Sequence, residues 1–179
     1  MEQLIRLPNF RQNKGLGNEV GYYVFDYPPE HELVVRQRIQ YMKNKNSKFN
    51  DGYELVVFDL YDIVIEMLEE EGFLDLCYGF EQKNGLDRIV TAIERLVYEE
   101  NMVEQYIQKN TPQMAVVVLI GVGKCYPFLR SHKVLNNLHH AVDHVPVIMM
   151  YPGTYDGQQL VLFSELKDDN YYRAFRLVD

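Results

Sequence analysis

The amino-acid sequence predicts an α/β fold: a three-layer domain in which a mainly parallel central sheet is flanked by helices and becomes mixed at its C-terminal edge. Short apolar runs without polar alternation recur along the chain, as expected for strands that are buried on both faces of a parallel sheet. Longer segments with helical periodicity separate these runs, which is typical of α/β proteins. At 179 residues, the chain is expected to form a single domain over residues 1–179.

The first predicted strand covers residues 21–27. Pro28 and Pro29 end it, because proline has no N–H to donate to a sheet and restricts the residue before it. A helix is expected from about Glu30, with its apolar side chains on one face. The polar run at residues 44–52 has the composition of a loop.

The second predicted strand covers residues 53–59 and leads directly into a helix. Asp59 is a suitable N-cap for this helix, and Gly72 can end it in a left-handed conformation. A long helix is predicted over residues 85–109, because its apolar residues keep helical spacing for about six turns before Pro112.

The most apolar stretch of the chain, residues 114–120, is predicted to be the central strand. Ser131 is expected to cap the helix that follows it. Residues 145–151 are predicted to form the next strand, which ends at a turn rich in glycine and proline. Residues 160–166 and 171–178 are expected to complete the sheet as edge strands.

The charge balance of the chain is acidic. It has 18 Lys and Arg residues against 26 Asp and Glu residues, a formal net charge of -8. A negatively charged protein is not steered towards a nucleic-acid backbone, so direct contact with DNA is disfavoured. The support for DNA binding is limited to the basic residues Arg36, Arg38, Lys43, Lys45 and Lys48.

The cysteines and the apolar runs indicate a cytoplasmic protein without a membrane partner. Cys77 and Cys125 lie far apart and form neither a CxxC motif nor a Cys/His metal-binding spacing, which fits a reducing compartment. The N-terminal residues are expected not to act as a signal peptide, because Glu2, Arg6 and Pro8 interrupt them. The longest apolar run is far shorter than the roughly 20 residues needed to span a bilayer.

The carboxyl ends of the predicted strands are the first place to look for a ligand site, because open parallel sheets bind ligands there. The sequence IGVGK after the predicted central strand resembles part of a phosphate-binding loop. The candidate residues for an anion-binding or nucleotide-binding turn are Gly121, Gly123, Lys124, Asp26 and Asp59.

Two positions argue against a working phosphate loop. The first glycine of the motif would fall at Val118, inside a strand, and the hydroxyl that binds magnesium would fall at Cys125. For Asp26 and Asp59, capping and turn chemistry is favoured over catalysis. For Gly121 and Gly123, a tight turn and the close approach of the backbone to an anion are equally good explanations.

Catalytic and metal-binding motifs are missing from the sequence. Four histidines lie in one segment: His132, His139, His140 and His144. His140 and His144 have the i, i+4 spacing that puts two imidazoles on one helical face, but Ala141 stands where an HEXXH motif needs glutamate. No GxSxG motif occurs. The sequence therefore predicts no catalytic site, no metal and no cofactor.

Two segments have residue types that suit a partner surface. Asparagine is a poor helix former unless its amide is used, so Asn136 and Asn137, near Arg130, either contact a partner or bond neighbouring loops. Residue types enriched at interface hot spots cluster near the C-terminus: Tyr171, Tyr172, Arg173 and Phe175. Ordinary packing of an edge strand explains this second cluster equally well.

Four strings of this sequence resemble the BrxB family of BREX phage-defence systems. They are NKGLGNEVGYYVFDY (13–27), GVGKCYPFLRSHKVLNNLHH (121–140), YPGTYDGQQL (151–160) and LKDDNYYRAFRLV (166–178). These long strings occur in the family's order, which makes the resemblance specific. From about residue 44 to residue 113, only the pattern of elements matches.

The resemblance implies membership of a multi-protein system that methylates host DNA and blocks replication of phage DNA. It implies other BREX subunits as partners, PglZ first and then BrxC and PglX. The family has no established enzymatic activity, so the resemblance implies a non-enzymatic adaptor or scaffold; the alternative is a degenerate phosphate-loop-like domain that binds nucleotide as a regulatory subunit. The candidate partner contacts are Asn13, Lys14, Asn18, Glu19, Arg130, His132, Asn136, Asn137, Tyr171, Tyr172, Arg173 and Phe175.

Overall fold

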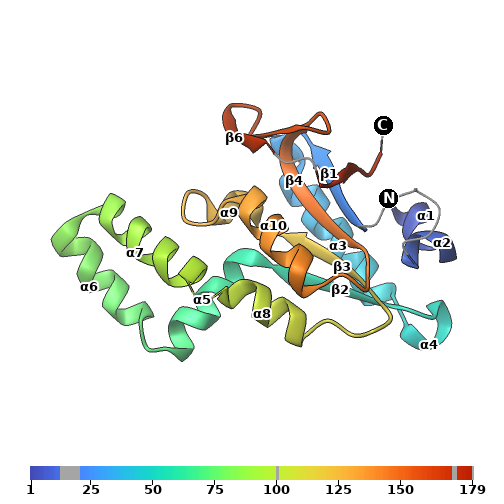
Figure 1. Cartoon of the computed structure of the whole chain (residues 1–179), viewed down its shortest axis with the longest axis horizontal. Helices are drawn as coiled ribbons and strands as arrows, with labels where there is room; N and C mark the ends of the chain where they lie inside the picture. The colour runs from blue at the N-terminus through green and yellow to red at the C-terminus, as the bar shows by residue number, and fades with distance from the viewer. Residues whose placement is uncertain (13–20, 100, 171–172, 179) are drawn as a thin grey trace.

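A mainly parallel sheet organises the protein. The computed structural model describes residues 1–12, 21–99, 101–170 and 173–178. Its parallel strands are β1 (Tyr22–Tyr27), β2 (Glu54–Asp59), β3 (Ala115–Ile120), β4 (Val147–Tyr155) and β7 (Phe175–Arg176), in the order β2–β3–β4–β1–β7 (Figure 1). β5 (Gln159–Leu162) pairs antiparallel with the end of β4, and β6 (Leu166–Asn170) pairs with β5. The predicted sheet, parallel and then mixed towards the C-terminus, is confirmed.

Helices cover both faces of the sheet, which completes the three predicted layers. They are α1 (Glu2–Ile5), α2 (Pro8–Arg11), η1 (Pro29–His31), α3 (Glu32–Lys45), α4 (Lys48–Asp51), α5 (Leu60–Glu70), α6 (Leu74–Asn84), α7 (Leu86–Glu99), α8 (Met102–Lys109), α9 (Val122–Cys125) and α10 (Ser131–Ala141). Along β3, Val117 and Leu119 pack into the core beneath α5, α8 and α10, while Val116 and Val118 face the core beneath α1–α3. Side chains of a strand alternate between its two faces, so a continuous apolar run serves both cores.

The first half of the chain follows the sequence prediction closely. The predicted strands at residues 21–27 and 53–59 correspond to β1 and β2, and α3 lies between them. Gly72 follows α5 with φ +70°, as its predicted role as a helix end requires. The expected loop at residues 44–52 instead contains the short helix α4.

The single long helix predicted over residues 85–109 is wrong, because α7 and α8 are separate helices. Asn101 lies between them with φ 48°, a left-handed conformation that cannot continue a right-handed helix. Asparagine tolerates this conformation better than other side chains do. The break allows α8 to pack against α10, while α7 turns away to pack against α6.

The C-terminal strands differ from the prediction in their bounds and positions. β4, and not β3, lies in the middle of the parallel order, and it continues past residue 151 to Tyr155. Phe163 and Ser164 have positive φ angles of 54° and 59°, so the strand predicted at 160–166 turns there and becomes the hairpin β5–β6. Among the described residues of the predicted edge strand 171–178, Phe175–Arg176 form β7 and pair with β1.

The helices α6 and α7 form a hairpin that extends away from the sheet (Figure 1). α6 was not predicted, and none of its residues is buried. It packs against α7 and α5. Across the described ranges, no helix has the length and apolar composition that a membrane crossing requires.

Candidate functional site

Asp59, at the carboxyl end of β2, is fully engaged in bonds within the protein. Its Oδ1 accepts hydrogen bonds from the backbone N–H groups of Tyr61 at 3.1 Å and Asp62 at 3.4 Å, which confirms the predicted cap of α5. Its Oδ2 accepts a hydrogen bond from Lys124 Nζ at 2.5 Å. Asp59 therefore joins the start of α5 to the turn after β3.

Lys124 is held between two carboxylates. Its Nζ lies 2.5 Å from Asp59 Oδ2 and 3.2 Å from Asp62 Oδ1. Burial alone lowers the pKa of Lys124, but the hydrogen bond and charge of Asp59, followed by those of Asp62, outweigh it and raise the pKa above its ordinary value. The ammonium group that a phosphate loop would direct at a nucleotide is thus already neutralised by these carboxylates.

The two glycines of the turn after β3 are closely packed. Gly121 has φ +82°, and a Cβ atom added there would lie 2.3 Å from Asp59 Oδ1. The carboxylate of Asp59 therefore lies directly against the turn, where it would repel a phosphate. A Cβ on Gly123 would lie 2.8 Å from the Phe163 ring. Close packing against Asp59 and Phe163 accounts for glycine at both positions.

A hollow of about 530 Å³ adjoins Asp59 between α3 and α5. Its α5 wall has the carboxylates of Asp62 and Glu66, and its α3 wall has Arg36 and Lys43. The guanidinium of Arg36 pairs with Glu32 at 2.5 Å. The charges around this hollow are mixed and partly paired, so the hollow does not favour a polyanionic ligand.

Two other basic residues of α3, Arg38 and Lys45, also have partners. Arg38 forms an ion pair with Glu2, and its guanidinium lies over the Tyr41 ring at 5.2 Å. Lys45 Nζ lies over the same ring at 4.7 Å. These contacts reduce the positive surface that DNA binding at this helix would need.

Asp26 connects three strands. The side chain of Arg176 in β7 donates two hydrogen bonds to the Asp26 carboxylate, each at 3.0 Å. The backbone N–H of Tyr155 in β4 donates a third at 3.2 Å. Asp26 thus stabilises the edge of the sheet, and no free carboxylate for catalysis is present at the end of β1.

Asp168 in β6 accepts hydrogen bonds from two adjacent residues of α10. Ser131 Oγ donates to Asp168 Oδ2 at 3.1 Å, and His132 Nδ1 lies 2.8 Å from Oδ1. Ser131 is the first residue of the helix and not its cap, which is Arg130. Because serine bonds the aspartate directly and not the histidine, these three residues do not form the relay of a serine hydrolase.

Asn137 has a structural role between α10 and α8. Its amide donates to Asn101 Oδ1 at 3.4 Å and to Glu104 Oε1 at 3.2 Å. Glu104 is buried, and burial raises the pKa of its carboxyl group, while the hydrogen bond from Asn137 acts in the opposite direction. Asn136 is half-buried on the same helix. At least one of the two adjacent asparagines, Asn137, therefore helps to pack α10 against α8.

His139 lies under the C-terminal segment. Its ring stacks on Tyr22 with a centroid distance of 3.8 Å. Burial, followed by the positive charge of Arg173, lowers the pKa of His139 to about 4, although a hydrogen bond with the Arg173 backbone acts against this. α10 and the residues before β7, two segments that carry the family resemblance, are therefore in contact.

The remaining predicted contact residues differ in their exposure. Arg173 and Phe175 are exposed, and the Phe175 ring lies 6.3 Å from the Tyr23 ring. His132 is buried and Arg130 is half-buried. Six other candidates lie outside the described residues: Asn13, Lys14, Asn18, Glu19, Tyr171 and Tyr172.

The described residues contain no cluster of three or more His, Cys, Asp or Glu side chains suited to a metal ion. The expectation that His140 and His144 share a helical face is wrong, because α10 ends at Ala141.

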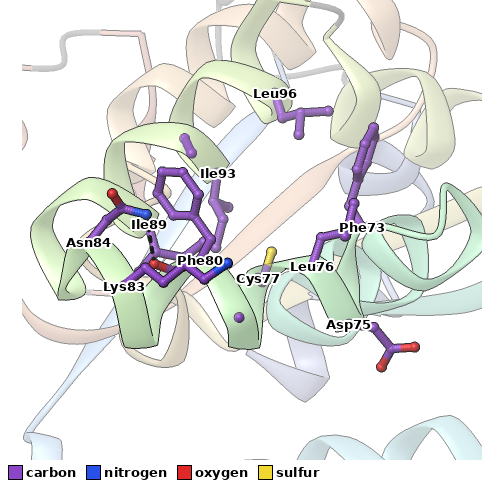
Figure 2. A pocket seen from close by; sticks show the side chains of 12 residues that line it. Phe73, Asp75, Leu76, Cys77, Phe80, Lys83, Asn84, Ile89, Ile93 and Leu96 are labelled. Atoms are coloured by element: carbon purple, nitrogen blue, oxygen red, sulfur yellow. Dashed lines mark hydrogen bonds between the residues drawn. The ribbon is translucent and has the colours of Figure 1, made fainter.

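An apolar groove lies between α6 and α7, and the sequence analysis missed it (Figure 2). It has a volume of about 480 Å³. On the α6 side, it is lined by Phe73, the N-cap of the helix, and by Leu76, Cys77 and Phe80, at positions i, i+3, i+4 and i+7. On the α7 side, it is lined by Ile89, Ala92, Ile93 and Leu96, with the same spacing. This spacing was the signal available in the sequence. Apolar residues at every second position from Leu74 to Phe80 obscured it, because they imitate a strand.

The fold and the site define an α/β domain whose polar strand ends are held by internal bonds and whose helical hairpin exposes an apolar groove. The BrxB family, described as "BREX protein BrxB", matches residues 56–177 of the chain. A relative from Bacillus cereus (strain H3081.97), named BREX protein BrxB, is 51% identical over 174 residues, which cover 96% of this chain and 90% of the relative. Another from Escherichia coli O9:H4 (strain HS), also named BREX protein BrxB, is 31% identical over 180 residues, 99% of this chain and 88% of the relative. The chain belongs to the BrxB family of BREX proteins.

This membership confirms the resemblance seen in the four strings. The family match also covers much of the middle of the chain, where the sequence analysis found only a shared pattern of elements.

Proposed function

We propose that this protein is a non-enzymatic adaptor of a BREX phage-defence system and that it binds other BREX subunits. Membership of the BrxB family supports a role as a component of that system. The observation that carries the adaptor role is the internal pairing of Lys124 with Asp59 and Asp62. The strand ends, where α/β enzymes place their reactive groups, are used here for structure.

The partners proposed are PglZ first, and then BrxC and PglX. Arg173 and Phe175 are candidate contacts, because their side chains are exposed beside the edge strand β7. His132 and Asn137 would act indirectly, since their bonds hold α10 in place.

Pairwise binding to purified subunits tests the proposal. The protein would be mixed with PglZ, BrxC or PglX and analysed by size-exclusion chromatography and calorimetry in moderate salt. Co-elution with at least one subunit is expected. Independent elution from all three, confirmed by the absence of a calorimetric signal, would overturn the adaptor role.

The nucleotide-binding alternative is tested on the same sample. Binding would require Lys124 to leave both carboxylates and the phosphate to approach Asp59. The adaptor account therefore predicts no change in Tm when ATP and Mg²⁺ are added. A rise in Tm that is lost in Lys124→Gln would favour a regulatory nucleotide-binding domain, because a bound ligand stabilises the folded state.

A further inference from the structure

The hairpin of α6 and α7 exposes large apolar side chains. Leu76 is 64% exposed, Tyr78 is 63% exposed, Phe80 is 39% exposed and Leu86 is 64% exposed. Single exposed apolar residues are common on protein surfaces, but a contiguous group that lines a groove indicates an interaction site. Leu76 and Phe80 line the groove itself (Figure 2).

The dimensions of the groove suit a short helix. α6 has 11 residues, which correspond to a length of about 16 Å, or three turns. The walls are two helices whose backbone N–H and C=O groups bond within each helix, so they offer no edge to an extended peptide. A helical ligand satisfies its own backbone groups and needs only apolar contacts.

The charges around the groove are unequal at its two ends. Asp75 lines the end next to Phe73, near the exposed run Glu69–Glu71 at the α5–α6 corner. Lys83 lines the opposite end, beside Phe80 (Figure 2). From Glu66 to Asn84 the sequence has six acidic residues and one basic residue. A ligand with basic residues at one end would complement this distribution.

We infer that the groove between α6 and α7 binds an amphipathic helix of a partner protein, with apolar anchors at i, i+3 or i+4, and i+7 and with lysine or arginine residues over the α5–α6 corner. This inference rests on the proposed adaptor function and identifies the chemistry of the partner segment. The excess of acidic residues disfavours a second copy of the same hairpin as the occupant, because like charges would meet.

Cys77 provides a built-in reporter of groove occupancy. It lines the groove and is half-buried, whereas Cys125 is fully buried. Burial raises the pKa of both thiols, that of Cys125 to about 12. A maleimide reagent is therefore expected to modify Cys77 and to leave Cys125 unmodified in the folded protein. Intact-mass spectrometry measures the modification rate with and without a bound peptide.

The probe is a synthetic peptide of about 15 residues, long enough to form a helix, that contains leucines at helical amphipathic spacing and lysines elsewhere. It is expected to slow modification of Cys77 about tenfold at saturation, because the bound helix covers the thiol. A peptide of the same composition with dispersed leucines, and an amphipathic leucine–glutamate peptide, are expected to give no protection. Equal protection by either comparison peptide, or no protection by the probe, would overturn the inference.

Variants separate the groove from the rest of the surface. The double variant Leu76→Gln/Phe80→Gln is expected to raise the Kd of the probe, measured by fluorescence anisotropy, by at least about tenfold, because it removes two anchors. The matched control Leu33→Gln/Val34→Gln changes two exposed apolar residues of α3, and its Kd should equal that of the parent. Circular dichroism verifies that each variant is folded.

A second set of variants tests the charge requirement. Neutralising Glu69–Glu71 to glutamine is expected to raise the Kd of the probe several-fold at low salt and to have less effect at high salt. The control neutralises three exposed carboxylates elsewhere, Glu30, Asp143 and Glu165. An equal effect of both sets would show non-specific attraction and contradict the inference.

The outcome for the groove is distinguishable from the outcome for the adaptor role. If the Leu76→Gln/Phe80→Gln variant still binds a BREX subunit with the affinity of the parent, the adaptor role stands and the groove is not the contact. If no subunit binds the parent, the adaptor role fails whatever the peptide results are. A concentration-dependent dimer that is lost in the same variant would assign the groove to a second copy and overturn the inference.

Discussion

At the residue scale, Asp59 has two roles, and the residues next to it in the sequence predict one of them. Its place between a strand and a helix predicts a cap, and the structure confirms that cap. Its second bond, to Lys124, spans 65 positions of the chain. A contact over that separation depends on the pairing of β2 with β3, which local sequence patterns do not encode.

Gly121→Ala tests the contact between the turn and Asp59. Alanine tolerates the left-handed backbone conformation of Gly121 less well than glycine does. Its Cβ would also displace the Asp59 carboxylate, which weakens the cap of α5 and the ion pair with Lys124. The matched control is Gly52→Ala, because the backbone angles are similar: φ 72° and ψ 11° at Gly52, and φ 82° and ψ 11° at Gly121. A Cβ on Gly52 would meet no atom closer than 3.9 Å. Backbone strain should cost both variants about 1–2 kcal/mol, and Gly121→Ala about 1 kcal/mol more. Equal unfolding free energies in urea would contradict the contact.

His139 predicts a pH dependence of stability. Its pKa is lowered from 6.5 to about 4, so at intermediate pH the unfolded chain binds a proton there that the folded protein does not. Stability is therefore lost as pH falls from about 6.5 to about 4. Allowing for partial exposure, this loss is about 1–2 kcal/mol.

The variant His139→Phe keeps an aromatic ring next to Tyr22 and removes the titrating group. Its unfolding free energy should change less between pH 7 and pH 4.5 than that of the parent, by about 1–2 kcal/mol. His140→Phe changes an exposed neighbour and removes only the smallest contribution to the lowered pKa of His139, so this variant should keep most of the pH dependence of the parent. An unchanged dependence in His139→Phe would refute this explanation.

At the element scale, the hairpin β5–β6 is attached to α10 through Asp168. This residue bonds Ser131 and His132, and its side chain is only 9% exposed. Both segments carry the family resemblance, but their contact could not be predicted, because a separation of 36–37 positions gives no periodic signal in the sequence. The unpredicted turn at Phe163 and Ser164 brings β6 back towards the helix.

Asp168→Ala should destabilise the protein by about 2–4 kcal/mol, because it leaves the polar groups of Ser131 and His132 without the carboxylate. Glu165→Ala, an exposed position in the same hairpin, should change stability by less than about 0.5 kcal/mol. Denaturant unfolding measures both values. Hydrogen exchange should also show faster opening of β6 in Asp168→Ala alone; similar exchange in both variants would refute the role of this contact.

The helices α6 and α7 show where the sequence pattern was insufficient. The apolar positions of α7 have helical spacing, and this helix was recognised, although its end was not. The left-handed Asn101 carries no apolar signal that would mark a break. The apolar residues of α6 also have helical spacing, but the apolar residues at every second position from Leu74 to Phe80 imitate a strand and obscured it.

At the scale of the whole molecule, the strand ends and the surface have different roles. Asp26, Asp59 and Lys124 bond within the protein and hold together the strand ends and the start of α5. The groove between α6 and α7 lies on a hairpin that extends from this body (Figure 1). The sequence predicted the layers and the strand-end turn, because apolar periodicity and turn residues are local signals. It did not predict the groove, which two helices form together.

The most direct measurement of the central claim is recovery of partners from cells that contain the complete BREX system. The tagged protein would be isolated, washed in moderate salt and analysed by mass spectrometry beside an untagged control. The adaptor account predicts enrichment of PglZ, BrxC or PglX. Recovery of the tagged protein without any BREX subunit would contradict it.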